Sequence, residues 1–281
     1  TKITDGLPED DFARVVREDP DRADLLYAGM ERGLYISFNG GEDWQAFQTN
    51  LPVVPITDLM VRRNDLVLST QGRAFWVVDD ISPLRQYMPE HETAAAHLYD
   101  PSKAYRLTPT KGRNGGGESF APSAPNGAVL YYALADEVDL EEQGLKIEIL
   151  DGSGNVIRTL KSDKEKGVEG GGANASVAIP AETGINRFTW DLRRDPMTSV
   201  DYGFLFGAAR DDDAIQGYTV APGNYGVLLT YGDVVQKSTV EVQWDPINTY
   251  DDQAIQAQQQ FLSNTFSMLD AIYKRVESLQ K

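Results

Sequence analysis

Short apolar runs separated by turn residues dominate the first 87 residues. Each run is a few residues long and is followed by Gly, Asn, Asp or Pro. This spacing predicts strands in antiparallel meanders rather than strand–helix–strand units. The expected strands cover 25–28, 33–37, 44–47, 56–61, 66–69 and 74–78.

A second set of strand patterns extends from about residue 128 to 244. Apolar and polar residues alternate over 145–150, a turn-forming sequence follows at 151–155, and 156–160 returns, which predicts a hairpin. Further runs cover 128–134, 184–192, 225–231 and 234–242. About seven short strands over this length predict an immunoglobulin-like or fibronectin-like β-sandwich.

The segment between these two regions is mixed in character. Residues 92–96 predict one helical turn and 103–107 predict a strand. Residues 109–127 are rich in Gly, Pro, Ser and Asn, which is typical of a linker. The Gly115–Gly117 run lacks the Gly-Lys-Ser/Thr ending of a phosphate-binding loop, so it predicts no nucleotide site.

The C-terminal end has a different pattern, because Gly and Pro are absent from Asp251 onward. Apolar residues recur there at three-, four- and seven-residue spacing, which predicts one long amphipathic helix, with Thr249 and Asp252 as its N-terminal capping pair. The apolar stripe comprises Ile255, Leu262, Phe266, Leu269, Tyr273, Val276 and Leu279. We expect this stripe to pack on its own domain; the alternative is a partner or coiled-coil contact.

Composition narrows the function classes. The formal net charge of −17 disfavours general binding to nucleic acid and docking on anionic membranes. The chain has no Cys and two His, which excludes disulfide scaffolds, thiolate metal sites and His-rich zinc sites. No apolar run is long enough for membrane insertion, and no signal peptide is recognisable. Because the chain begins with Thr1, we interpret it as a mature or truncated product.

The most specific motif lies at residues 37–44. It fits the Asp-box pattern, Ser/Thr-x-Asp/Asn-x-Gly-x-x-Trp, through Ser37, Asn39, Gly41 and Trp44. Asn39 can hydrogen-bond nearby backbone and fix a tight turn, and Gly41 permits a positive φ. Trp44 can then bury a large ring across the hairpin. We expect these four residues to be structural rather than catalytic.

The chain resembles the C-terminal portion of bacterial Asp-box (BNR) repeat β-propeller proteins of the sortilin-like or glycosidase-like kind. Residues 12–20, 25–29 and 33–35 before the motif, and 64–80 after it, resemble closing propeller blades. Residues 184–193 and 221–225 resemble the Ig-like β-sandwich that follows such propellers. The resemblance covers nearly the whole chain but only the C-terminal part of the longer family proteins.

This resemblance implies four segments. Residues 1–87 would be closing propeller blades, 88–127 a bridging strand and linker, 128–247 an Ig-like sandwich, and 248–281 the helix. A blade has about 40–50 residues, and each of its faces packs on a neighbouring blade. Residues 1–87 hold at most two blades, so we expect the N-terminal propeller portion of the same protein as a partner.

Candidate chemical groups are few. Asp79 and Asp80 are adjacent, so on a strand they would face opposite sides, and a blade edge or turn is favoured over a glycosidase pair. Asp211–Asp213 could offer oxygen ligands to Ca²⁺, but the spacing of an EF-hand is missing and a solvated loop is favoured. We therefore predict no catalytic, cofactor or metal residues in this chain. The Asn174–Ser176 glycosylation sequence carries little weight.

These observations lead to one functional hypothesis and two alternatives. The leading hypothesis is a non-catalytic C-terminal part of a secreted bacterial Asp-box propeller protein, completing the propeller and binding protein or glycan. The first alternative is part of a glycoside hydrolase whose catalytic carboxylates lie in a missing N-terminal portion. The second is a structural component of an extracellular assembly, built through the helix or an open blade edge. In each case the expected location is extracytoplasmic.

Overall fold

The computed structural model describes residues 2–107, 125–135, 144–162, 178–197, 216–247 and 251–280. The chain divides into two compact units, Thr1–Tyr87 and Met88–Lys281, and each is described separately. Most of the described elements are strands, and one long helix lies at the C-terminal end. The prediction of a mostly β chain with a C-terminal helix is confirmed.

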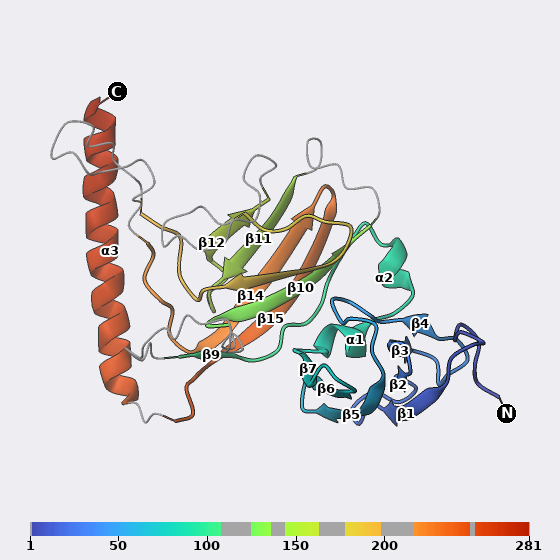
Figure 1. Cartoon of the computed structure of the whole chain (residues 1–281). Coiled ribbons are helices and arrows are strands. Elements are labelled where there is room, and N and C mark those ends of the chain that lie inside the picture. The colour runs from blue at the N-terminus through green and yellow to red at the C-terminus, as the bar shows by residue number, and fades with distance from the viewer. Residues whose placement is uncertain are drawn as a thin grey trace. The chain divides into compact units, whose positions relative to one another are not determined.

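The first unit contains two antiparallel sheets in which consecutive strands are neighbours (Figure 1). The four-stranded sheet has the order β1-β2-β3-β4, and the three-stranded sheet has the order β5-β6-β7. Their strands are β1 (Ala13–Glu18), β2 (Leu26–Met30), β3 (Leu34–Ser37), β4 (Gln45–Ala46), β5 (Ile56–Arg62), β6 (Asp65–Thr70) and β7 (Phe75–Val78), followed by the short helix α1 (Ser82–Gln86). The meander connectivity predicted for this region is therefore observed.

The two sheets of the first unit share one hydrophobic core. It contains Val15, Leu25, Tyr27, Leu34, Ile36, Leu51, Val54, Ile56, Leu59, Leu66, Leu68 and Ile81. A smaller cluster of Ala28, Met30 and Trp44 covers the other face of the four-stranded sheet. The other face of the three-stranded sheet is different, because Met60, Phe75 and Val77 there are 56%, 75% and 49% exposed.

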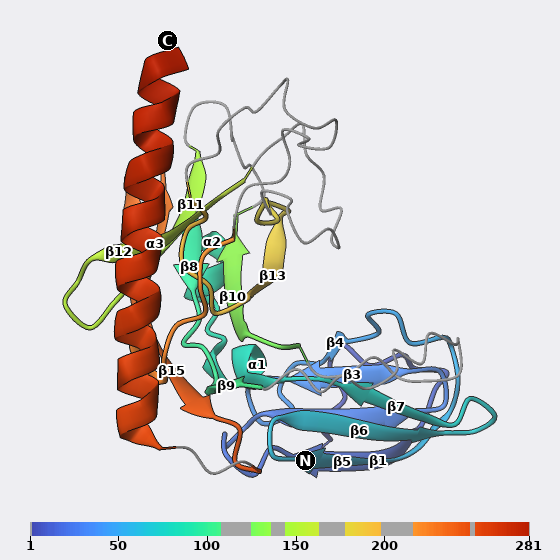
Figure 2. The ribbon, with the colours of Figure 1, turned by 90° about the vertical axis from the view of Figure 1, so that its left-hand side faces the viewer.

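The second unit contains a three-stranded sheet, β13-β10-β8, and a five-stranded sheet, β12-β11-β14-β15-β9 (Figures 1 and 2). All pairings are antiparallel except that of β9 with β15. The elements are α2 (Glu90–Thr93), β8 (Ala96–Leu98), β9 (Ala104–Arg106), β10 (Ala128–Leu134), β11 (Leu145–Leu150), β12 (Val156–Lys161), β13 (Gly184–Trp190), β14 (Gly223–Tyr231), β15 (Val234–Trp244) and α3 (Asp252–Gln280). Residues from both sheets form one core, which includes Leu130, Tyr132, Ile147, Trp190, Leu229 and Val240.

The segment expected to bridge two domains contributes strands to both sheets of the second unit. β8 pairs with β10, and β9 pairs with β15. The expected helical turn at 92–96 lies earlier, as α2, because β8 begins at Ala96. The Gly115–Gly117 run lies outside the described residues.

Helix α3 contacts its own unit through part of the predicted stripe. Phe266 meets Tyr218 edge to face at 5.4 Å between ring centroids, and the Gln259 side-chain amide donates a hydrogen bond to the Thr219 carbonyl oxygen at 3.2 Å. Leu279, predicted to share this stripe, is 81% exposed instead. The proposed capping residue Thr249 lies outside the described residues.

Candidate functional site

The loop at residues 37–44 joins β3 to β4 and is closed by side-chain hydrogen bonds. The buried Ser37 hydroxyl oxygen accepts the Gly41 N–H at 2.9 Å and donates to the Asn39 Oδ1 atom at 2.9 Å. Asn39 Oδ1 also accepts the Asp43 N–H at 3.0 Å. Gly41 has a φ of 90°, which a side chain would oppose. The four predicted motif residues Ser37, Asn39, Gly41 and Trp44 thus lie in one hairpin loop, a geometry that favours a structural role.

Trp44 connects this loop to the N-terminal segment. Its indole N–H donates to the Ile3 carbonyl oxygen at 3.2 Å, and its backbone N–H donates to the Asp5 carbonyl oxygen at 2.9 Å. The Trp44 side chain is 6% exposed as a result. The approach of this segment is close, because a Cβ atom on Gly6 would lie 1.9 Å from the Trp44 carbonyl oxygen.

We expect Ser37→Ala to destabilise the first unit by about 1–3 kcal/mol, because the buried Gly41 N–H loses its acceptor. The measurement is the free energy of unfolding in urea, monitored by hydrogen exchange in β3 and β4. Glu42→Ala, at an exposed position of the same loop, serves as the control and should change stability by less than about 0.5 kcal/mol. Equal effects of the two variants would contradict a structural role for Ser37.

The three-stranded sheet presents the most open apolar surface of the first unit. Met60, Val67 and Val77 are register partners across β5, β6 and β7, so their side chains lie in one row on one face. Phe75, two residues before Val77 on β7, extends this surface. The Phe75 side chain is 75% exposed. We call Met60, Val67, Phe75 and Val77 the open sheet face.

Strand β7 also has an unpaired edge within the described part of the chain. The Thr70 N–H donates to the Ala74 carbonyl oxygen at 3.1 Å, so these two residues form a hydrogen-bonded pair next to the β6–β7 ladder. Hydrogen-bonded and non-bonded pairs alternate along an antiparallel ladder. Phe75 and Val77 therefore direct their backbone N–H and C=O groups away from β6.

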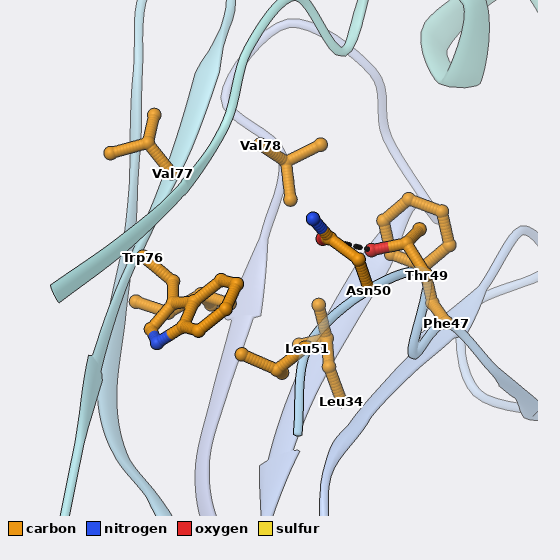
Figure 3. A pocket seen from close by; sticks show the side chains of 9 residues that line it. Leu34, Phe47, Thr49, Asn50, Leu51, Trp76, Val77 and Val78 are labelled. Atoms are coloured by element: carbon orange, nitrogen blue, oxygen red, sulfur yellow. Dashed lines mark hydrogen bonds between the residues drawn. The ribbon is translucent and has the colours of Figure 1, made fainter. Parts of the chain in front are cut away.

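A shallow hollow lies beside β7 (Figure 3). Its cavity volume is about 20 Å³, far below that of a typical ligand pocket. The lining residues are Leu34, Phe47, Thr49, Asn50, Leu51, Leu68, Trp76, Val77 and Val78. Thr49 and Asn50 are the polar members of this lining. A cavity of this size has room for about one water molecule, so the hollow by itself is no ligand site.

The remaining predicted candidates are not brought together. Asp79 is exposed at the end of β7. Asp80 lies in the turn that follows, where its backbone N–H donates to the Asp65 carboxylate at 3.2 Å and its own carboxylate accepts the Ser82 N–H at 3.2 Å. This geometry supports the turn interpretation of Asp80. Asp211–Asp213 and Asn174–Ser176 lie outside the described residues.

The two histidines form a pair that sequence reasoning did not foresee. The rings of His91 and His97 stack with centroids 3.5 Å apart and planes 15° from parallel. Burial, and then the neighbouring His91, lower the pKa of His97, while Asp100 acts in the opposite direction. His91 Nδ1 accepts the Met88 N–H at 3.2 Å. Two stacked rings are one ligand pair at most, and within the described ranges no group of three or more His, Cys, Asp or Glu could hold a metal ion.

The chain matches no protein-family model and no curated protein. Two solved structures with weak similarity are extracellular domains of a B. thetaiotaomicron protein, BT4673, assigned to a one-component system in one case and to a hybrid two-component system in the other. Their sequence identities are 12% and 11%, and their TM-scores are 0.22 and 0.21. The matches cover 85% of this chain but only 26% of those chains, so this chain spans about a quarter of their length.

Among the described helices, none is both long enough and apolar enough to cross a membrane.

Proposed function

We propose that this chain is a non-catalytic C-terminal part of an extracytoplasmic Asp-box propeller protein. In this proposal the first unit completes a β-propeller, and the second unit with α3 acts as an accessory docking module. The observation that carries the proposal is the pair of consecutive meander sheets, packed on one core, with an apolar face left open on the second. Consecutive meander sheets packed face to face are the arrangement of neighbouring propeller blades.

The open sheet face supports a further sheet as the partner of the first unit. Met60, Val67 and Val77 form one row, and Phe75 lies beside them with most of its ring exposed. Contiguous exposed apolar patches of this kind mark interaction sites, and unpaired strand edges accept additional strands. A neighbouring blade would cover the face, and a strand along β7 would pair with the outward backbone groups of Phe75 and Val77.

We propose a polypeptide rather than a glycan as the partner of this region, and the residue types around the small hollow beside β7 support this. Its lining is mainly aliphatic and aromatic, with Trp76 and Phe47 as the largest side chains. A sugar would need several polar groups directed at its hydroxyls, and the lining offers Thr49 and Asn50. The acidic charge and the absence of Cys are compatible with a location outside the cytoplasm.

Two measurements on protein from its native source test this proposal. The first is intact mass under denaturing and then native conditions. We expect either a chain with a mass above 31.1 kDa or an N-terminal piece that co-purifies with the chain. A well-folded, solitary 31.1 kDa monomer would overturn the propeller interpretation.

The second measurement is amide hydrogen exchange of the source protein compared with the isolated 281-residue chain. We expect the amides of Phe75 and Val77 to exchange at least about tenfold more slowly in the source protein, because a partner strand occupies them. The amides of Leu66 and Leu68 in β6, which already face ladder partners, are the internal control and should change little. Equal exchange of Phe75 and Val77 in both samples would count against a partner at β7.

A further inference from the structure

Helix α3 carries two apolar stripes rather than one. The inner stripe comprises Ile255, Leu262, Phe266, Tyr273 and Val276, which are all half-buried. The inner stripe includes the contact with Tyr218 described above. No side chain described for this 29-residue helix is fully buried, so packing on its own unit leaves much of the helix surface available.

The outer stripe comprises Phe261, Met268, Ile272 and Leu279. These side chains are 69%, 67%, 51% and 81% exposed. Their successive spacings of seven, four and seven residues are those of the a and d positions of a heptad repeat, which place side chains on one seam of a helix. A helix of this length extends for about 43 Å, long enough for several layers of such packing.

The charge distribution along α3 permits a second copy of this chain to cover the outer stripe. The chain carries a formal charge of −17, so most surfaces of two copies repel each other. Residues 253–269 of α3 are an exception, because this stretch of seventeen contains no charged residue. Two copies can therefore approach along this part of the helix without placing like charges side by side.

We propose that the outer stripe of α3 packs against the same stripe of a second copy of this chain. Such an interface is isologous, the commonest arrangement in homodimers. It goes beyond the function proposed above, since it involves neither the open sheet face nor the hollow. The inner stripe keeps α3 on its own unit, and the outer stripe joins the two copies.

The position of Arg275 favours an antiparallel arrangement of the two α3 helices in the dimer. Arg275 follows Met268 by seven residues, so it occupies the same seam. A parallel pair would place the two Arg275 side chains next to each other, and adjacent like charges oppose association. An antiparallel pair places Arg275 opposite the neutral Gln258 of the second copy and Phe261 opposite Ile272 of the second copy. Antiparallel packing also aligns the two helix dipoles favourably.

The first test compares two double variants of the full chain by sedimentation equilibrium over a range of protein concentrations. Phe261→Glu/Met268→Glu places charge in the outer stripe, and we expect the dissociation constant of the dimer to rise by more than about tenfold. The matched control is Gln256→Glu/Ser267→Glu, which adds the same charge at exposed positions on another face and should leave the dimer intact. Circular dichroism should show equal helix content in both variants.

Three outcomes would overturn the proposal. One is a wild-type chain that stays monomeric at every concentration. Another is a dimer that survives Phe261→Glu/Met268→Glu. The third is a dimer lost equally in the control. A dimer that survives the α3 variant but is lost in Phe75→Lys, a case of the second outcome, would move self-association to the open sheet face. The last outcome would leave α3 without a partner while still permitting a partner for the first unit.

The second test determines orientation by disulfide cross-linking, because the native chain has no Cys. We expect a mixture of Gln258→Cys and Arg275→Cys chains to form a cross-linked heterodimer under mild oxidation. Arg275→Cys alone should cross-link poorly, because its two sulfurs would lie near opposite ends of the seam. Efficient cross-linking of Arg275→Cys alone would overturn the antiparallel arrangement.

Discussion

Replacing Arg85 by Ala is expected to lower the free energy of unfolding of the first unit by about 3–5 kcal/mol. The Arg85 guanidinium Nε lies 2.9 Å and 3.0 Å from the two carboxylate oxygens of Asp19, whose side chain is 0% exposed. The guanidinium also donates to the Asn64 side-chain oxygen at 2.9 Å and to the Arg63 carbonyl oxygen at 2.8 Å. Removing it takes the counter-charge from the buried Asp19 carboxylate, which keeps the Asp21 and Arg22 N–H groups as hydrogen-bond donors. Burial and the nearby Asp19 charge also raise the pKa of Tyr27, which keeps its hydroxyl protonated.

Amide hydrogen exchange in β1–β7 of the full chain measures the free energy of unfolding lost in Arg85→Ala. Two further variants serve as comparisons. Asp19→Asn/Arg85→Met removes both charges, so it should lose clearly less stability than the sum of the two single changes. Arg17→Ala breaks the exposed ion pair with Asp58 and should cost only about 0–1 kcal/mol. If Arg85→Ala behaved like Arg17→Ala, the Asp19–Arg85 pair would not stabilise the first unit as argued.

Replacing Trp190 by Ala should have a comparable effect on the second unit, about 3–5 kcal/mol. Trp190 is 1% exposed, its indole N–H donates to the Arg193 carbonyl oxygen at 2.9 Å, and its ring meets Tyr225 edge to face at 5.5 Å. The change leaves a large cavity between the two sheets and removes this hydrogen bond. Urea unfolding followed by hydrogen exchange in β10 and β13 measures the loss.

Trp190→Phe is the companion variant for this prediction. It keeps an aromatic ring in the core but loses the indole donor and some volume, so it should lose less stability than Trp190→Ala. A loss below about 1 kcal/mol for Trp190→Ala would show that the second unit does not depend on this side chain.

The elements with strong local patterns were predictable. Strict alternation marked 145–150, and β11 covers Leu145–Leu150; the expected return strand at 156–160 is β12, Val156–Lys161. Strands β8 and β9 have three residues each, too few for a clear period, and their partners are distant in sequence. Their assignment to the sheets of the second unit depends on tertiary pairing that no local pattern records.

The candidate surfaces were harder to predict than the strands. The loop of Ser37, Asn39, Gly41 and Trp44 was found because its turn chemistry is local. The exposure of Phe75 depends instead on whether another layer covers that face of the sheet, which alternation along one strand cannot show. The Asp19–Arg85 pair joins residues 66 positions apart, and no spacing in the sequence predicts it.

The parallel pairing of β9 with β15 has a consequence for synthesis on the ribosome. Ala104 pairs with Val242, so the edge strand of the five-stranded sheet has no partner until nearly the whole chain has been translated. The first unit contains sheets built from consecutive strands and can fold as it emerges. Between these two events, the nascent chain carries the first unit followed by β9, which has not yet met its partner strand. A chaperone that acts on this protein during translation would meet β9 in that state.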